Sequence, residues 1–477
     1  MDDASFQFVL FGLAAALISN LSRAPVWRSI VLLAANIIFL GLLAHNFVVL
    51  LPFMAFLLLG YIGLALLQNR SSKVPWIIVA VLFAYLWLKK YAFLPKGVFL
   101  QFPYFTLGLS YIFFRVLHLL IEAGDSSNRR RIPFLSYLLY TLNFATLLSG
   151  PIQRYEDFEG DQFAQSPILL DWSTIGLQLE RIIRGFFKVN VLAVLLQAVK
   201  DDALAQMGEP LAVSAKFYPA FRLAVVYPFF LYVNFSGYID IVVAIARLMR
   251  LRLPENFDRP FSSTSFLEFW SRWHITLSNW LRTYAYNPLL LLSMRRISSP
   301  ALQSLLGVGC FFVTFFLVGL WHGRTSEFVV FGLLQGGGVA INKLWQLGSA
   351  QVLGRKSYKA LANHSFYKAF ARGLTFSWFA FTLFWFWGGW QQIDKLFAAI
   401  GILPWAEVWV LVWLSATVVL TTWERLRSGI LSIRTSAGPV FLSRYARVVY
   451  ASALGLGALF MTVSLKQPAP EIIYKAF

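Results

Sequence analysis

The sequence has few charged residues and almost no cysteine. Only 13% of its 477 residues are Asp, Glu, Lys or Arg, and 58% are hydrophobic, whereas soluble domains carry about 25% charged residues. Cys310 is the single cysteine, so the chain cannot form an internal disulfide or a CxxC zinc or redox motif. Cys310 lies in an apolar run and is expected to be a small buried side chain. This composition excludes a globular enzyme with one membrane anchor.

Common enzymatic motifs are absent as well. The sequence contains no GxSxG elbow, no HExxH, no P-loop and no GxGxxG. Gly336-Gly337-Gly338 is not followed by Lys-Ser/Thr, as a phosphate-binding loop requires, and is expected to permit close helix packing instead. We therefore expect neither a bound metal nor a resident cofactor.

Acidic residues are scarce relative to basic ones, with 22 Asp and Glu against 41 Lys and Arg, a net charge of +19. The basic residues lie between apolar runs and do not gather on a soluble module, which argues against nucleic-acid binding. They cluster at residues 23–28, 70–73, 129–131, 247–259, 295–296, 343–372 and 425–447. Because these clusters alternate with neutral or acidic gaps, they indicate the cytoplasmic side of a multi-pass protein of the cell (inner) membrane.

Apolar segments of near-membrane length recur from end to end. The first residues, with Asp2 and Asp3, are acidic, so the N-terminus is expected outside the cytoplasm, without a signal peptide. Helices are predicted at 6–20, 29–44, 47–66, 75–93, 104–122, 217–246, 302–321, 325–341, 373–388, 408–422 and 448–465. The expected fold is an all-α polytopic membrane protein with about 11–13 transmembrane or re-entrant helices.

Two segments break the alternation. Residues 133–170 and 263–296 each begin and end on the predicted cytoplasmic side, which a single crossing cannot do. They are expected to be re-entrant or interfacial. Because irregular backbone at membrane depth requires surrounding protein or a watery cavity, both are expected to line an internal cavity.

Two of the five histidines follow a tryptophan in apolar surroundings: Trp273-His274 and Trp321-His322. Ionisable residues at membrane depth indicate function by default. His322 precedes Gly323, and its position between two spans predicts a short connection at the outer leaflet. A neutral imidazole there could act as general base on a hydroxyl. The alternative is a hydrogen-bonded structural histidine.

If residues 266–283 form one helix, several large side chains share a face. These are Trp270, Trp273, His274, Leu277 and Trp280. Glu268 and Arg272 are spaced to pair, and Ser278 is placed to orient the His274 imidazole. The alternative is an interfacial amphipathic helix with its tryptophans at the headgroup level.

The largest cytoplasmic piece is predicted at residues 342–372, which carry six basic residues and no acidic one. The basic residues are Lys343, Arg355, Lys356, Lys359, Lys368 and Arg372. One interpretation is a basic face on the membrane surface. The other is a dock for an anionic acyl donor, either a coenzyme A phosphate or an acidic carrier protein.

Five motifs follow one another along the chain: SGPIQRY at 149–155, FSGYID at 235–240, PENF at 254–257, EFWSRWHITLS at 268–278 and GLWHG at 319–323. They occur in the order seen in membrane-bound O-acyltransferases, and the chain resembles that family over about residues 105–345. The resemblance is closest to the bacterial branch, which includes the alginate O-acetyltransferase membrane subunit and the teichoic-acid D-alanyl transferase. A second histidine that the pattern places near Gln335 is absent.

The resemblance implies one membrane domain over residues 1–477, with peripheral helices at 1–104 and 346–477. It implies a ring of helices around a central channel. The family's catalytic histidine corresponds to His322 and its second motif histidine to His274. The substrate and donor channel is expected to be lined by Trp321, Trp270, Trp273, Arg272, Ser278 and Asp240.

The implied activity moves an acyl group, above all acetyl, from a cytoplasmic donor to the outer face. The donor is a co-substrate, either acetyl-coenzyme A or a carrier-protein thioester. The acceptor is a hydroxyl of an extracytoplasmic polysaccharide or of a partner transferase of the SGNH type. A second hypothesis is D-alanyl transfer to a teichoic-acid-like polymer, which depends on a carrier protein. A third is a transporter or channel, which fits the polytopic pattern but leaves the motifs unexplained.

Overall fold

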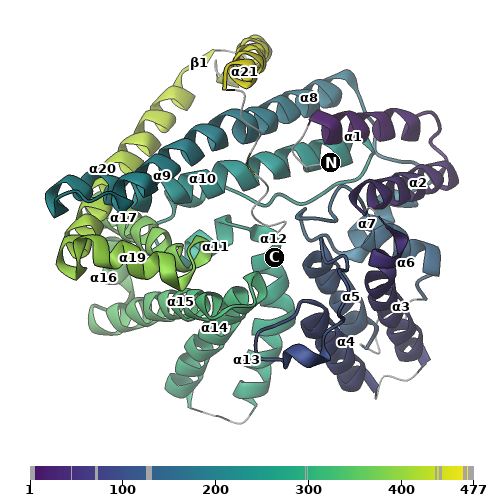
Figure 1. Cartoon of the computed structure of the whole chain (residues 1–477), viewed down its shortest axis with the longest axis horizontal. Helices are drawn as coiled ribbons and strands as arrows, with labels where there is room; N and C mark the ends of the chain where they lie inside the picture. The colour runs from purple at the N-terminus through teal and green to yellow at the C-terminus, as the bar shows by residue number, and fades with distance from the viewer. Residues whose placement is uncertain are drawn as a thin grey trace. The chain divides into compact units, whose positions relative to one another are not determined.

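A computed structural model describes residues 6–44, 46–69, 73–124, 131–295, 297, 299–435, 438–439, 443–465 and 470. Nearly all of their regular structure is α-helical (Figure 1), so the predicted all-α class is confirmed. The chain divides into two compact units. The described residues of the first unit fall within 1–186 and 237–255, and those of the second within 187–236 and 256–470.

The first unit contains the N-terminal helices and the last part of α10. Its elements are α1 (Phe6–Ser19), α2 (Pro25–Leu43), α3 (Phe47–Asn69), α4 (Val74–Leu88), η2 (Lys96–Val98), α5 (Leu109–Ala123), α6 (Phe134–Thr141), α7 (Tyr155–Gln162) and most of α8 (Trp172–Phe187). Helix α3 packs against both α4 and α5 (Figure 1). The rings of Phe8, Phe39 and Phe144 contact one another in its core.

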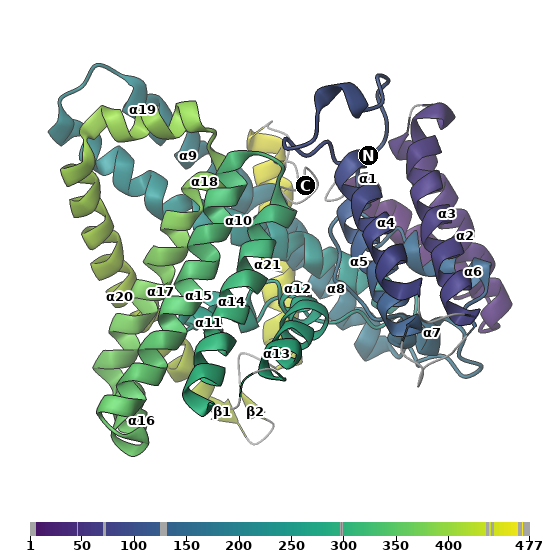
Figure 2. The same cartoon turned by 90° about the horizontal axis from the view of Figure 1, so that it is seen from below.

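The second unit contains the helices that carry both Trp-His pairs. Helices α14, α15, α17 and α20 lie side by side in this order and form a row (Figure 2). In that view α16 lies at the lower ends of the helices in the row, and α19 lies at the upper ends. The elements are η3 (Lys188–Leu192), α9 (Ala193–Gly208), the first part of α10 (Val213–Leu248), η4 (Pro260–Ser262), α11 (Phe266–Arg272), α12 (Ile275–Leu281), η5 (Arg282–Tyr286), α13 (Asn287–Met294), α14 (Pro300–His322), α15 (Ser326–Val352), α16 (Arg355–Asn363), α17 (Ser365–Thr382), α18 (Phe384–Trp387), α19 (Trp390–Ile400), α20 (Ile402–Ser432), β1 (Arg434–Thr435), β2 (Gly438–Pro439) and α21 (Arg444–Leu465).

Eight helical stretches among the described residues are long and apolar enough to cross a membrane. They are Pro25–Leu43, Phe47–Leu67, Trp172–Gly208, Val213–Leu248, Pro300–His322, Ser326–Val352, Ile402–Ser432 and Arg444–Ser464. The polytopic prediction is therefore confirmed. Two shorter apolar helices, α1 and α4, correspond to the predictions at 6–20 and 75–93. The predicted outer position of the N-terminus concerns residues 1–5, which lie outside the described residues.

The sequence prediction overlooked one of these stretches, Trp172–Gly208, in which a π-helical turn joins α8 to α9. Charged residues in α8 interrupt its apolar pattern. In the first unit the side chain of Arg181 donates to Asp240 at 2.9 Å and to Glu255 at 2.6 Å. Because these carboxylates pair with the guanidinium, the helix tolerates a charge that hydropathy alone counts against it.

Two other segments differ from their predictions, and two predicted not to be single crossings are short or non-spanning helices. The predicted helix at 373–388 is divided at Leu383 into α17 and α18, and the predicted cytoplasmic piece at 342–372 is helical, comprising the end of α15, all of α16 and the start of α17. Residues 133–170 form two eight-residue helices, α6 and α7, before α8 begins. Residues 275–294 are helical without a break but are not among the eight candidate spans.

Glycines hold α14 and α15 in close contact, as expected for the run at 336–338. A Cβ at Gly319 would meet the backbone of Gly332 at 2.2 Å, and one at Gly336 would meet the carbonyl oxygen of Phe312 at 2.5 Å. A Cβ at Gly338 would meet the indole nitrogen of Trp378 at 2.1 Å. A Cβ at Gly337, in contrast, would have no neighbouring atom within 4 Å. Gly319, Gly336 and Gly338 therefore fix the distance between neighbouring helices, and Gly337 does not.

The neighbours Gly336 and Gly337 offer a matched test of this packing. Gly336→Ala is expected to destabilise the folded protein by about 1–3 kcal/mol, because the methyl group overlaps the Phe312 carbonyl. Gly337→Ala is expected to be neutral or to stabilise by up to about 1 kcal/mol, since alanine favours the helix and has space there. Thermal unfolding in detergent compares the two. Equal midpoints for both variants would contradict the assignment.

Candidate functional site

His322 is the last residue of α14 and is fully enclosed by aromatic rings. Its side chain is 1% exposed. The imidazole lies 5.8 Å from the ring of Phe331 on α15 and 5.2 Å from the ring of Phe386 on α18, measured between centroids. Gly323, which follows, has no room for a Cβ, because one would overlap the ring of Phe328. The aromatic enclosure excludes water from a titratable group.

The second pair, Trp273-His274, lies at a break between two short helices. Helix α11 ends at Arg272, Trp273 is extended, and His274 adopts the left-handed conformation with φ 45° before α12 begins at Ile275. Residues 266–283 therefore do not form one helix, and the shared face that such a helix would give is not present. A β-bridge pairs Phe257 with Trp273 and holds the backbone extended, and aromatic contacts anchor the Trp273 ring.

The side chain of Asn256 fixes the orientation of His274. Its Oδ1 accepts hydrogen bonds from the backbone N–H of Thr276 at 3.1 Å and from the Thr276 hydroxyl at 2.9 Å. The same oxygen lies 3.2 Å from Nδ1 of His274. Since the Thr276 N–H can only donate, the atom facing it is the amide oxygen, and Nδ1 of His274 must carry the proton. Nε2 is then the acceptor nitrogen of a neutral imidazole.

The protonation state of His274 follows from its burial. The residue lies outside the eight candidate spans, and its side chain is 0% exposed. Burial lowers the pKa of His274 to about 3, because the charged imidazolium loses its hydration. The imidazole is therefore neutral at physiological pH, and it can accept a proton or a hydrogen bond only through Nε2.

Trp321 connects the two histidines within the second unit. Its ring centroid lies 4.6 Å from that of His322 and 6.2 Å from that of His274. Phe235 of α10 contacts the other side of His274 at 5.0 Å. Segments almost fifty residues apart in the sequence thus place both histidines in one buried aromatic cluster, which consists of His274, His322, Trp321, Phe331 and Phe386.

The other predicted channel residues of this unit have different surroundings. Trp270 packs against Phe315 at 5.1 Å, and its indole N–H is buried without a hydrogen-bond partner among the described residues. Arg272 pairs with Glu268 as predicted and also with Asp258. The Ser278 hydroxyl is buried without a partner among the described residues, so it does not orient His274, and Asn256 has that role instead.

Asp240 belongs to the first unit, where it pairs with the guanidinium groups of Arg181 and Arg184. Its predicted place in a substrate channel stays a prediction. In the same unit His118 holds the motif at 149–155, since its Nε2 accepts a hydrogen bond from the Tyr155 N–H at 3.2 Å while Nδ1 lies 3.3 Å from Glu122. His118 is therefore a structural histidine.

Sequence reasoning missed two polar groups near the cluster. Asn256 is part of the PENF motif, but nothing in its spacing from His274 indicates a contact. Gln335, on the same helix as Phe331, donates to the hydroxyl of Thr382 at 2.8 Å, and its buried Oε1 has no partner among the described residues. The described residues contain no group of three or more His, Cys, Asp or Glu placed to hold a metal.

Comparisons with known proteins agree with the motif order. Residues 30–362 match the family model described as MBOAT, the membrane-bound O-acyltransferase family. A teichoic acid D-alanyltransferase of Streptococcus thermophilus is 31% identical over 50% of this chain and 57% of its own length. A probable alginate O-acetylase of Pseudomonas fluorescens is 32% identical over 50% of this chain and 44% of its own.

A peptidoglycan O-acetyltransferase of Helicobacter pylori is 30% identical over 44% of this chain and 38% of its own length. The matches therefore span about half the length of these curated relatives or less. The family model, in contrast, covers most of the chain and includes both Trp-His pairs. On this evidence the chain belongs to the membrane-bound O-acyltransferase family.

Proposed function

We propose that the protein is an O-acyltransferase that uses the aromatic cluster around Trp321 as its active site. The observation that carries the proposal is the meeting of His274 and His322 at one tryptophan ring in a fully buried setting. A neutral imidazole in a dry, enclosed site is suited to act as a general base.

The proposed reaction transfers an acyl group from a thioester to a hydroxyl. The acceptor O–H bond breaks as its proton passes to an imidazole nitrogen of His322, while the acceptor oxygen bonds to the thioester carbonyl carbon. The C–S bond then breaks, and the departing thiolate takes the proton back from His322. The histidine is thereby restored, and no redox partner or metal is required.

His274 is proposed to line the donor side of the passage together with Trp270, Trp273 and Trp321. Its fixed tautomer presents Nε2 as an acceptor, so it can receive a hydrogen bond from a donor amide or hydroxyl. The thioester is proposed to arrive from the side of the basic clusters, which the positive-inside rule places in the cytoplasm. The acceptor would then be extracytoplasmic, and the protein would lie in the cytoplasmic membrane.

The acyl group is proposed to be acetyl and the acceptor a cell-envelope polysaccharide or a partner transferase. Relatives named for alginate and peptidoglycan acetylation support this choice. Transfer of D-alanine from a carrier protein is the second candidate, which the Streptococcus thermophilus relative favours. Membranes supplied with labelled acetyl-coenzyme A or with a D-alanyl carrier protein separate the two, because only the correct donor labels envelope material.

His322→Ala is expected to lower acyl transfer by about 100- to 10,000-fold, the usual contribution of a positioned base. Incorporation of labelled acyl groups into envelope material, normalised to the folded protein in the membrane, measures the effect. The matched control is His364→Ala, since His364 is exposed at the start of α17. Unchanged transfer by the His322 variant would disprove the assignment.

Asn256→Ala is expected to lower kcat by about 10- to 100-fold, with a smaller change in KM, because His274 loses the acceptor that sets its orientation. Asn256→Asp keeps an oxygen at the same place and should recover most of the turnover. The ratio of kcat values per folded molecule separates this role from a general loss of stability. Equal turnover for both variants would argue against positioning by Oδ1.

A further inference from the structure

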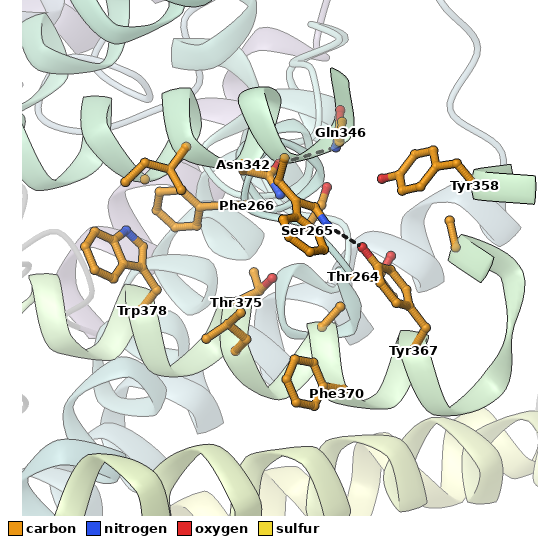
Figure 3. Close-up of a pocket in the computed structure, with 16 residues that line it drawn as sticks. Thr264, Ser265, Phe266, Asn342, Gln346, Tyr358, Tyr367, Phe370, Thr375 and Trp378 are labelled. Carbon is orange, nitrogen blue, oxygen red and sulfur yellow. Dashed lines mark hydrogen bonds between the residues drawn. The ribbon is translucent and has the colours of Figure 1, made fainter. Parts of the chain in front are cut away.

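A cavity of about 530 Å³ lies in the second unit (Figure 3), and no residue of the two Trp-His pairs lines it. It is enclosed by the start of α11, the C-terminal half of α15, α16 and α17, and Ile341, Trp345, Tyr358, Tyr367, Phe370 and Trp378 form much of its wall. This volume is within the range of about 300–1,000 Å³ typical of ligand pockets. At 1.5 Å per residue, Asn342 in its wall is about 16 Å along α15 from Phe331, which contacts His322.

The rim of this pocket is apolar and exposed. Ile341 is 64% exposed, Trp345 58% and Phe370 49%. On the surface of a helix row that crosses a membrane, such side chains face the lipid acyl chains. At this rim the Trp345 indole N–H already has a partner, since it donates to the Tyr367 hydroxyl at 3.0 Å. The pocket is thus suited to an apolar chain that enters from the side.

Positive charge surrounds the same end of the helix row. Helix α16, which supplies Tyr358 and Ala362 to the pocket wall, also carries Arg355, Lys356 and Lys359 on exposed positions. No acidic residue occurs between 342 and 372. With nine residues, α16 is too short to cross a membrane, and a short basic amphipathic helix is typical of the membrane surface.

We propose that this pocket binds an anionic phospholipid, with an acyl chain between α15, α16 and α17 and the headgroup phosphate against Lys356 and Lys359. Charge complementarity and the lateral, apolar rim favour a lipid over a soluble acidic protein, which would need a rim of polar groups. The proposal concerns binding and does not depend on the acyl-transfer reaction.

The bound lipid would contact the segment that leads to the proposed active site. Thr264, Ser265 and Phe266 form part of the pocket wall. From Phe266 the aromatic rings continue to Phe269 at 5.7 Å and from there to Trp273 at 5.6 Å, both nearly parallel. Occupancy of the pocket therefore braces α11 and, through it, the break at Trp273-His274. We expect anionic lipid to raise the stability of the protein and, on the basis of the proposed function, its turnover.

The test uses the full chain in nanodiscs of phosphatidylcholine with and without phosphatidylglycerol. Native mass spectrometry counts retained phosphatidylglycerol, and thermal unfolding reports its stabilisation. Ala371→Trp fills the pocket, whereas the double variant Lys356→Gln/Lys359→Gln removes headgroup charge. Each is expected to weaken phosphatidylglycerol binding about 10- to 30-fold. The control is Lys395→Gln, because Lys395 is an exposed residue of α19, which lies at the opposite end of the helices from α16 (Figure 2). This change should leave phosphatidylglycerol binding unaltered.

Several results would overturn the proposal. Equal retention of phosphatidylcholine and phosphatidylglycerol would remove the role of charge. Equal stabilisation by inorganic phosphate would indicate an anion site without an acyl chain. Binding that survives Ala371→Trp but not the lysine variant would place the lipid on the surface and not in the pocket. Loss of thioester turnover in the lysine variant with unchanged lipid binding would assign α16 to the acyl donor.

Discussion

The candidate site depends on one constraint, the need to satisfy backbone hydrogen bonds where the helix breaks at Trp273-His274. A break in a dry interior leaves amide groups without water. The segment at 256–258 supplies their partners, because the Asp258 N–H donates to the Arg272 carbonyl and the Ile275 N–H donates to the Asn256 carbonyl, each at 3.0 Å. The Asn256 side chain satisfies the next amide, that of Thr276.

Asn256 therefore both stabilises the helix break and orients the site histidine. The oxygen that completes the start of α12 is the oxygen that faces Nδ1 of His274. The conformation of the break and the tautomer of the imidazole are therefore set together. The left-handed φ of His274 costs free energy for a residue with a Cβ, and the hydrogen bonds at the break, with the aromatic contacts of Trp273, offset that cost.

Much of the fold was predictable from sequence, because apolar length and the placement of lysine and arginine are local signals. The spans α2, α3, α14 and α15 and the packing role of Gly336 follow from such signals. The stretch Trp172–Gly208 did not, since Arg181 is neutralised by carboxylates some sixty residues or more away in the sequence. The break at His274 was also hidden, because tryptophans and leucines at helical spacing suggest continuity, and only the distant Asn256 reveals the interruption.

The glycine contacts between α14 and α15 have a consequence for motion. Two helices whose backbones touch at Gly319 and Gly332 cannot slide past each other without steric overlap. His322 and Phe331, one on each helix, therefore keep a constant separation as substrates come and go. We therefore expect entry and exit to rely on rotation of side chains such as Trp321 and on displacement of the shorter helices α11, α12 and α18. On this expectation α14 and α15 stay fixed relative to each other while the surrounding parts of the site move.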